Sequence, residues 1–190
     1  MTDLASPSVL ASCLAEYRRY KSIADRAIAH LPEPLLRQPP SRETNSIAVI
    51  VKHLAGNMLS RFTDFLTTDG EKAWRDRDSE FIDDFASRDA ILARWEQGWA
   101  CLFGALAELR EEDLAKIVPI RGEPHSVVMA LTRSLAHAAY HTGQIVQTAR
   151  ALAEREGIPW NTITVPRGGS GAFNLSKGYT PEAAPRSAAP

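Results

Sequence analysis

The chain has 190 residues, which most simply form one domain large enough to bury a core. Its 22 Lys and Arg residues and 23 Asp and Glu residues give a formal net charge of −1, so there is no electrostatic reason to expect nucleic acid or an anionic membrane as a partner. The N-terminal sequence MTDLASPSVL lacks the basic and apolar regions of a signal peptide, and charged residues or His interrupt the longest apolar stretches. We therefore expect a cytoplasmic protein with no membrane partner.

Four long segments carry apolar residues at helical spacing. Pro32 ends the first segment, Asn45 is a plausible N-cap of the second, Ser87 can cap the third, and Gly157 suits the position that follows the fourth. The predicted helices cover residues 8–31, 46–66, 87–109 and 126–156.

The segments between and after these helices differ in character. The stretch TTDGEKAWRDRDSEFIDDF is dense in charge and indicates a surface excursion, whereas IVPIRGEPH resembles a short extended piece with a Gly turn. Beyond Gly157 no helical period remains. The prediction is an all-α fold, a four-helix bundle with a polar insertion between helices 2 and 3 and an extended C-terminal tail. Residues 1–175 would form the bundle, and residues 176–190 a flexible tail.

Histidines lie on one face of each of two predicted helices. His137 and His141 are four residues apart, with Gln144 a turn further along, and they border residues that should be buried. On the second predicted helix, His53 and Asn57 share a face at the margin of the apolar stripe. If the two helices meet, three imidazoles can converge.

Three neutral imidazoles suit zinc, and they equally suit nickel, copper, iron or cobalt. Three protein ligands leave a coordination position open, as in catalytic rather than structural sites. Gln144 can then hold a ligand or a bound water in place. An H-x-x-x-H pair alone is also compatible with a surface pair or a satisfied core pair. His30 and His125 fall at predicted helix ends, where capping or exposure explains them.

Two stretches of the chain resemble a known family. SIAVIVKHLAGNMLSRFTDFLTTDGE and LTRSLAHAAYHTGQIVQTAR look like the DinB/YfiT-like superfamily of four-helix metalloproteins, and more narrowly a branch catalogued as a domain of unknown function. The resemblance implies that His53, His137 and His141 hold a divalent metal, commonly zinc or nickel. It also implies a homodimer and, for some members, thiol-S-transferase or thiol-dependent isomerase activity with a low-molecular-weight thiol.

The chemistry stays open at this point. A metal with a vacant position can activate a small thiol for attack on an electrophile, or water for hydrolysis, with Asn57 or Gln144 positioning groups. No general base is evident, and no catalytic residue is assigned. A metal-binding protein without turnover, serving sensing or stress functions, and a bundle with structural histidines are the other two hypotheses.

The charged segment 69–84 has two interpretations. It can fold over the metal end as a lid or contribute Arg77 to bind an anionic substrate, or it can be a solvated, self-paired run of charges. The composition favours the solvated run.

Overall fold

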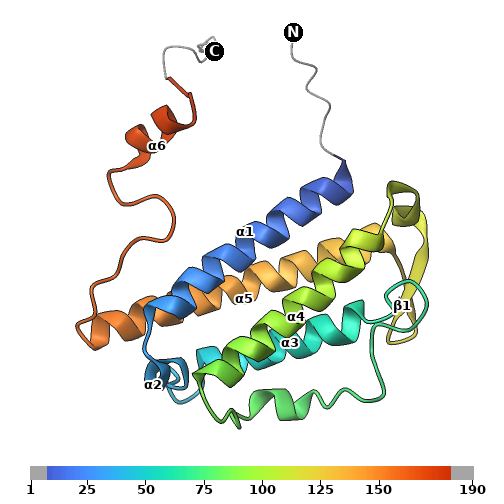
Figure 1. Cartoon of the computed structure of the whole chain (residues 1–190), viewed down its shortest axis with the longest axis horizontal. Helices are drawn as coiled ribbons and strands as arrows, with labels where there is room; N and C mark the ends of the chain where they lie inside the picture. Colours follow the sequence, from blue (N-terminus) through green and yellow to red (C-terminus); the bar gives the residue numbers. More distant parts are fainter. Residues whose placement is uncertain (1–7, 181–190) are drawn as a thin grey trace.

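The computed structural model describes residues 8–180, which are mostly helical (Figure 1). The elements in chain order are α1 (Val9–His30), α2 (Glu33–Leu36), α3 (Ile47–Phe62), the 3-10 helix η1 (Asp78–Phe81), α4 (Arg88–Glu108), the 3-10 helix η2 (Glu111–Ala115), β1 (Ile117–Ile120), β2 (Glu123–Ser126), α5 (Val127–Arg155) and α6 (Ser170–Ser176). The four long helices α1, α3, α4 and α5 confirm the predicted all-α bundle.

A serine begins each long helix. The side chains of Ser8, Ser46, Ser87 and Ser126 each accept a hydrogen bond from the backbone N–H three residues further on, which satisfies one of the free donors of the first turn. The cap of α3 is therefore Ser46 rather than the predicted Asn45. α3 also ends at Phe62, four residues before the predicted end, because the chain turns there while its apolar residues stay buried.

The helices form two pairs (Figure 1). α1 lies along α5, and α3 lies along α4. Within each pair the two helices run in the same direction, and the pairs run opposite to each other. Because α3 and α4 start at the same end, residues 63–87 must return along the length of α3. The predicted polar insertion is thus a crossover connection, which explains its length.

Large aromatic side chains fill the core between the pairs. Trp95 and Trp99 of α4 are each 1% exposed, and Tyr17 of α1 packs edge-on against Trp99. The polar atoms of two of these rings are satisfied, since Trp95 Nε1 donates to Asp25 at 2.6 Å and the Tyr17 hydroxyl donates to the Leu131 carbonyl at 2.9 Å. Both tryptophans of α4 therefore belong to the core.

The extended piece predicted before the last long helix is a β-hairpin. β1 pairs antiparallel with β2, and Ile117 lies opposite Ser126. The Asp69 carboxylate accepts hydrogen bonds from the backbone N–H groups of Arg121 and Gly122 in the hairpin turn, at 2.8 and 2.7 Å. The crossover and the hairpin are therefore fixed to each other at the end of the bundle where α3 finishes.

The C-terminal region is only partly extended. The chain leaves α5 without regular structure, as predicted, but residues 170–176 then form α6, which the sequence pattern did not indicate. Residues 181–190 of the predicted flexible tail lie outside the described residues. In the described part of the chain, no helix combines the length and apolarity that crossing a bilayer requires.

The contact between α3 and α4 depends on Gly98. A Cβ at this position would lie 2.6 Å from the Cα atom of Ala55, whereas a Cβ at Gly104 of the same helix would meet no atom within 4 Å. We expect Gly98→Ala to lower the free energy of unfolding by about 1–3 kcal/mol, because the helices must move apart. Gly104→Ala, the matched control, should raise it by about 0.5–1 kcal/mol. Urea denaturation measures both changes, and equal effects of the two substitutions would contradict this explanation.

Candidate metal centre

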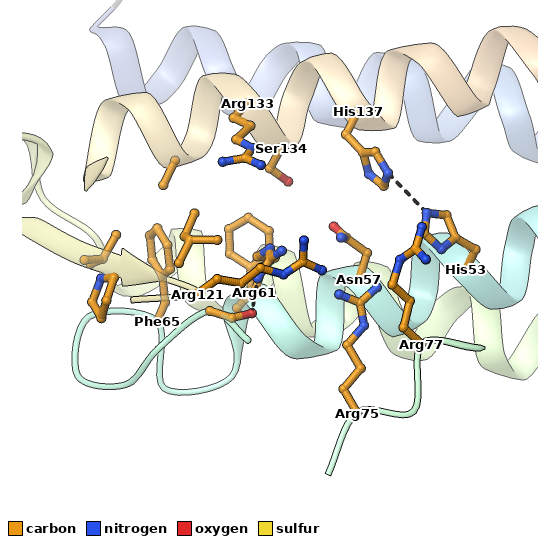
Figure 2. A pocket seen from close by; sticks show the side chains of 16 residues that line it. His53, Asn57, Arg61, Phe65, Arg75, Arg77, Arg121, Arg133, Ser134 and His137 are labelled. Atoms are coloured by element: carbon orange, nitrogen blue, oxygen red, sulfur yellow. Dashed lines mark hydrogen bonds between the residues drawn. The ribbon is translucent and has the colours of Figure 1, made fainter. Parts of the chain in front are cut away.

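Three histidine rings from α3 and α5 meet in one place. His137 and His141 stand one turn apart on α5. His53 faces His137 from α3 (Figure 2). The Nε2 atom of His137 lies 3.2 Å from the Nε2 atom of His53 and 3.2 Å from that of His141. One ligand atom from each ring falls within 4.8 Å of the others, so the cluster can hold a metal ion.

Partners on the far side of two rings fix which nitrogen faces the cluster. His53 Nδ1 lies 2.9 Å from Glu80 Oε2, and His141 Nδ1 lies 2.7 Å from Gln144 Oε1. Both partner atoms are acceptors, so each Nδ1 carries the proton and each Nε2 keeps its lone pair. The arrangement is the one found behind metal-bound histidines, where an outer partner sets the tautomer and orientation of the ring.

Two of the three nitrogen separations fit a shared ion. With metal–nitrogen bonds of about 2.0–2.1 Å and tetrahedral angles, two ligand nitrogens should lie about 3.3–3.4 Å apart. The observed 3.2 Å is close to that value. Without a metal, the Nε2 atom of His137 can donate a proton to only one of the two lone pairs that face it. The three rings are therefore better satisfied by a cation than by each other.

The surroundings keep the rings of α5 neutral. Burial is the main cause that lowers the pKa of His137 to about 3, and electrostatic repulsion from the neighbouring imidazoles of His141 and His53 adds to this effect. Burial also lowers the pKa of His141 to about 4, although the hydrogen bond that His141 donates to Gln144 opposes this shift. Only a neutral imidazole can bind a metal, so these two nitrogens are ready to do so at neutral pH.

The crossover supplies the carboxylate that holds His53. The side chain of Glu80 in η1 is 5% exposed, and it accepts hydrogen bonds from Arg75 at 2.8 and 3.0 Å as well as from His53. Burial tends to raise the pKa of Glu80, but the bonds from His53 and Arg75 outweigh it, and the pKa lies below its ordinary value. A Cβ at Gly56 of α3 would collide with the Glu80 carboxylate. The absence of a side chain at Gly56 therefore leaves the room that this carboxylate occupies.

These contacts correct the interpretation of segment 69–84 as a solvated run of charges. Arg75 and Glu80 are buried, and the ring of Phe81 stacks on that of His53 with 5.1 Å between centroids. The segment packs across the histidine cluster because it must cross back along α3. Sequence reasoning missed Glu80 altogether, since nothing in RDRDSEF separates the one buried carboxylate from its solvated neighbours.

A cavity of about 200 Å³ opens beside the cluster, between α3, α5, the crossover and the hairpin. His53 and His137 form one end of its wall (Figure 2). Two other residues that the sequence analysis singled out also line it: Asn57, one turn along α3 from His53, and Arg77 of the crossover, whose guanidinium lies over the Phe81 ring. Gln144 is not on this wall and acts behind His141.

The remaining histidines lie apart from the cluster. The prediction that His125 is explained by a helix end is wrong, because this residue is buried in β2 with its Nδ1 2.9 Å from the Glu123 carbonyl. His30 ends α1, as predicted, with its Nε2 2.8 Å from the Pro159 carbonyl oxygen.

The fold and the cluster define a helical-bundle protein with a possible three-histidine metal site. Residues 5–169 match the model of a family described as "Protein of unknown function (DUF1572)", and the chain belongs to that family. No curated protein matches the sequence. Among solved structures, one described as the crystal structure of the conserved protein of locus from Enterococcus faecalis is similar, with a TM-score of 0.60 and 15% identity over 77% of this chain and 98% of that one. At that identity the likeness shows the fold alone.

The lowered pKa values predict how pH affects the metal-free protein. Between pH 6.5 and 5 an unfolded histidine gains a proton, whereas His137 and His141 in the folded chain do not. The unfolded state then binds more protons, so the free energy of unfolding should fall as the pH falls through this range. His137→Gln removes one of the two groups and should flatten the slope. Thermal unfolding of chelator-treated protein tests this, and identical slopes for both proteins would contradict it.

Proposed function

We propose that this protein is a metal-dependent enzyme in which His53, His137 and His141 bind one divalent ion, zinc or nickel, and present it to the adjacent cavity. The observation that carries the proposal is the convergence of three histidine ligand nitrogens beside that cavity, where the rings of His53 and His137 form part of the wall. Three protein ligands leave at least one coordination position for a small molecule, which is the property of catalytic sites.

The likeness of the motifs to the DinB/YfiT-like superfamily supports the same assignment. His53 stands on α3 and the H-x-x-x-H pair on α5, as the resemblance implies, and membership of the wider superfamily is part of the proposal. A fold alone does not determine a reaction, so the argument for the chemistry comes from the residues around the cluster.

Of the possible reactions, the cavity wall favours thiol transfer over hydrolysis. A divalent ion, when bound, lowers the pKa of a coordinated thiol or water so that it becomes a nucleophile near neutral pH. Hydrolysis commonly needs a general base as well. Glu71 and Glu80, which pair with arginines of the cavity wall, are both engaged by those arginines, and Glu80 also orients His53. The wall therefore suits a low-molecular-weight thiol as the nucleophile and a second small molecule as the electrophile.

The residues of the chain have separate tasks in this proposal. Glu80 and Gln144 hold two imidazoles in the metal-binding tautomer, and Phe81 covers the ring of His53 from outside. The Asn57 amide lines the cavity one turn from His53, where it can orient a bound molecule by hydrogen bonding.

The first test is metal content. Protein purified without a His-tag should contain one equivalent of zinc or nickel by mass spectrometry, and His137→Ala should lose it while keeping its helical circular dichroism. Thiol-dependent consumption of an electrophile should disappear in the same variant. Ester hydrolysis without thiol would instead assign the hydrolase reaction, and metal-free wild-type protein would overturn the proposal.

The second test concerns Glu80. Glu80→Gln keeps the shape of the side chain but removes the charge that holds the Nδ1 proton of His53, and we expect metal affinity to fall about 10–100-fold. Asp84→Asn is the matched control, because Asp84 lies in the same crossover but pairs with Lys52 and is 66% exposed. Competition with a chromogenic chelator measures both affinities. An affinity of Glu80→Gln equal to that of Asp84→Asn would show that Glu80 does not position the ligand.

A further inference from the structure

The cavity beside the histidine cluster is lined by an unusual number of arginines. They come from separate parts of the chain (Figure 2): Arg61 from α3, Arg75 and Arg77 from the crossover, Arg121 from the hairpin turn and Arg133 from α5. The protein as a whole has a net charge of −1, so this concentration of positive charge is local.

Acidic side chains neutralise only part of this charge. Glu71 lies within 3.6 Å of three of the five guanidinium groups, and Glu80 pairs with one of those three. Even with Asp69 at the hairpin turn included, three carboxylates face five guanidinium groups, an excess of two positive charges. Within residues 8–180, Arg77 and Arg133 form no ion pair, and the one hydrogen bond of the Arg133 side chain joins it to the Nε2 atom of His125, at 3.1 Å.

The guanidinium groups also repel one another. The pKa of Arg61 lies below its ordinary value, and burial is the largest cause. Attraction to Glu71 opposes this shift, whereas repulsion from three neighbouring arginines adds to it. Like charges gathered at a cavity raise the energy of the empty site, and an anion that enters relieves the repulsion.

The arginines stand at a defined distance from the histidines. Arg61 follows His53 and Asn57 on α3 at steps of four residues, and Arg133 precedes His137 by four on α5. At ~1.5 Å of rise per residue, these positions lie about 6 Å from the cluster on α5 and about 12 Å on α3. Apolar side chains, among them Phe65 and Ile120, also line this cavity.

We propose that the cavity binds an organic anion whose carboxylate or phosphate is held by Arg133 and Arg121, while its apolar part lies against Phe65 and Ile120. Guanidinium groups suit this task because their fixed N–H groups match carboxylate and phosphate oxygens. As an assignment of substrate class the inference rests on the proposed function, but anion binding itself needs no metal.

The experiment uses the full chain after metal removal, so that oxyanions cannot bind to a metal ion instead. Phenyl phosphate, phenylacetate and the uncharged 2-phenylethanol are titrated into the protein by calorimetry. We expect at least one of the two anions to bind at least tenfold more tightly than the alcohol, and added sodium chloride to weaken it. The anion that binds better identifies a phosphate or a carboxylate as the natural group.

Variants then locate the site. Arg133→Gln should weaken the better anion at least tenfold, and Arg121→Gln, at an exposed turn, should weaken it as well without involving the packing of α5. Arg18→Gln is the matched control, because Arg18 is an exposed arginine of α1 outside the cavity wall. Binding of neither anion, or equal affinities in all three variants, would overturn the inference. Because the protein is metal-free throughout, a missing metal site would not affect this result.

Discussion

The contact between Glu80 and His53 is the interaction on which the rest of the site depends. It joins the crossover to the middle of α3, at the one place where Gly56 leaves room for a carboxylate. The same contact sets the tautomer of His53, so that its lone pair faces the two histidines of α5. A single hydrogen bond of 2.9 Å thus connects the path of a long polar segment to the chemistry of the cluster.

The position of the cluster follows from the pairing of the helices. α3 packs on α4 and α5 packs on α1, so the histidines occupy the seam between the two pairs rather than the interior of either. Such a seam can widen toward one end without disturbing the core of a pair, and here it widens into the arginine-lined cavity next to the hairpin. An ion bound by both helices would tie the pairs together, which is how metal binding stabilises a fold.

The sequence predicted the parts of the site that depend on helical periodicity. His137, His141 and Gln144 repeat at one-turn intervals on one helix, so their common face follows from their spacing alone. Glu80 could not be derived, because its burial depends on a crossover that returns along α3 and on the small residue opposite it. The grouping of arginines escaped prediction for the same reason, since Arg133 and the hairpin turn meet only through the tertiary fold. The spacing of residues along a helix determines which of them share a face, and the path of the chain determines which helix faces meet.

The buried charges of the crossover argue for a role beyond stability. Glu80 and Arg75 are 5% and 2% exposed, and removing two such charges from water commonly costs as much as their attraction returns. A pair of apolar side chains of similar size would hold the crossover against α3 at least as well. What an apolar pair cannot do is accept the Nδ1 proton of His53 and keep a fixed negative charge behind the ring. The presence of a costly ion pair at this one point is therefore best explained by the orientation of the His53 imidazole.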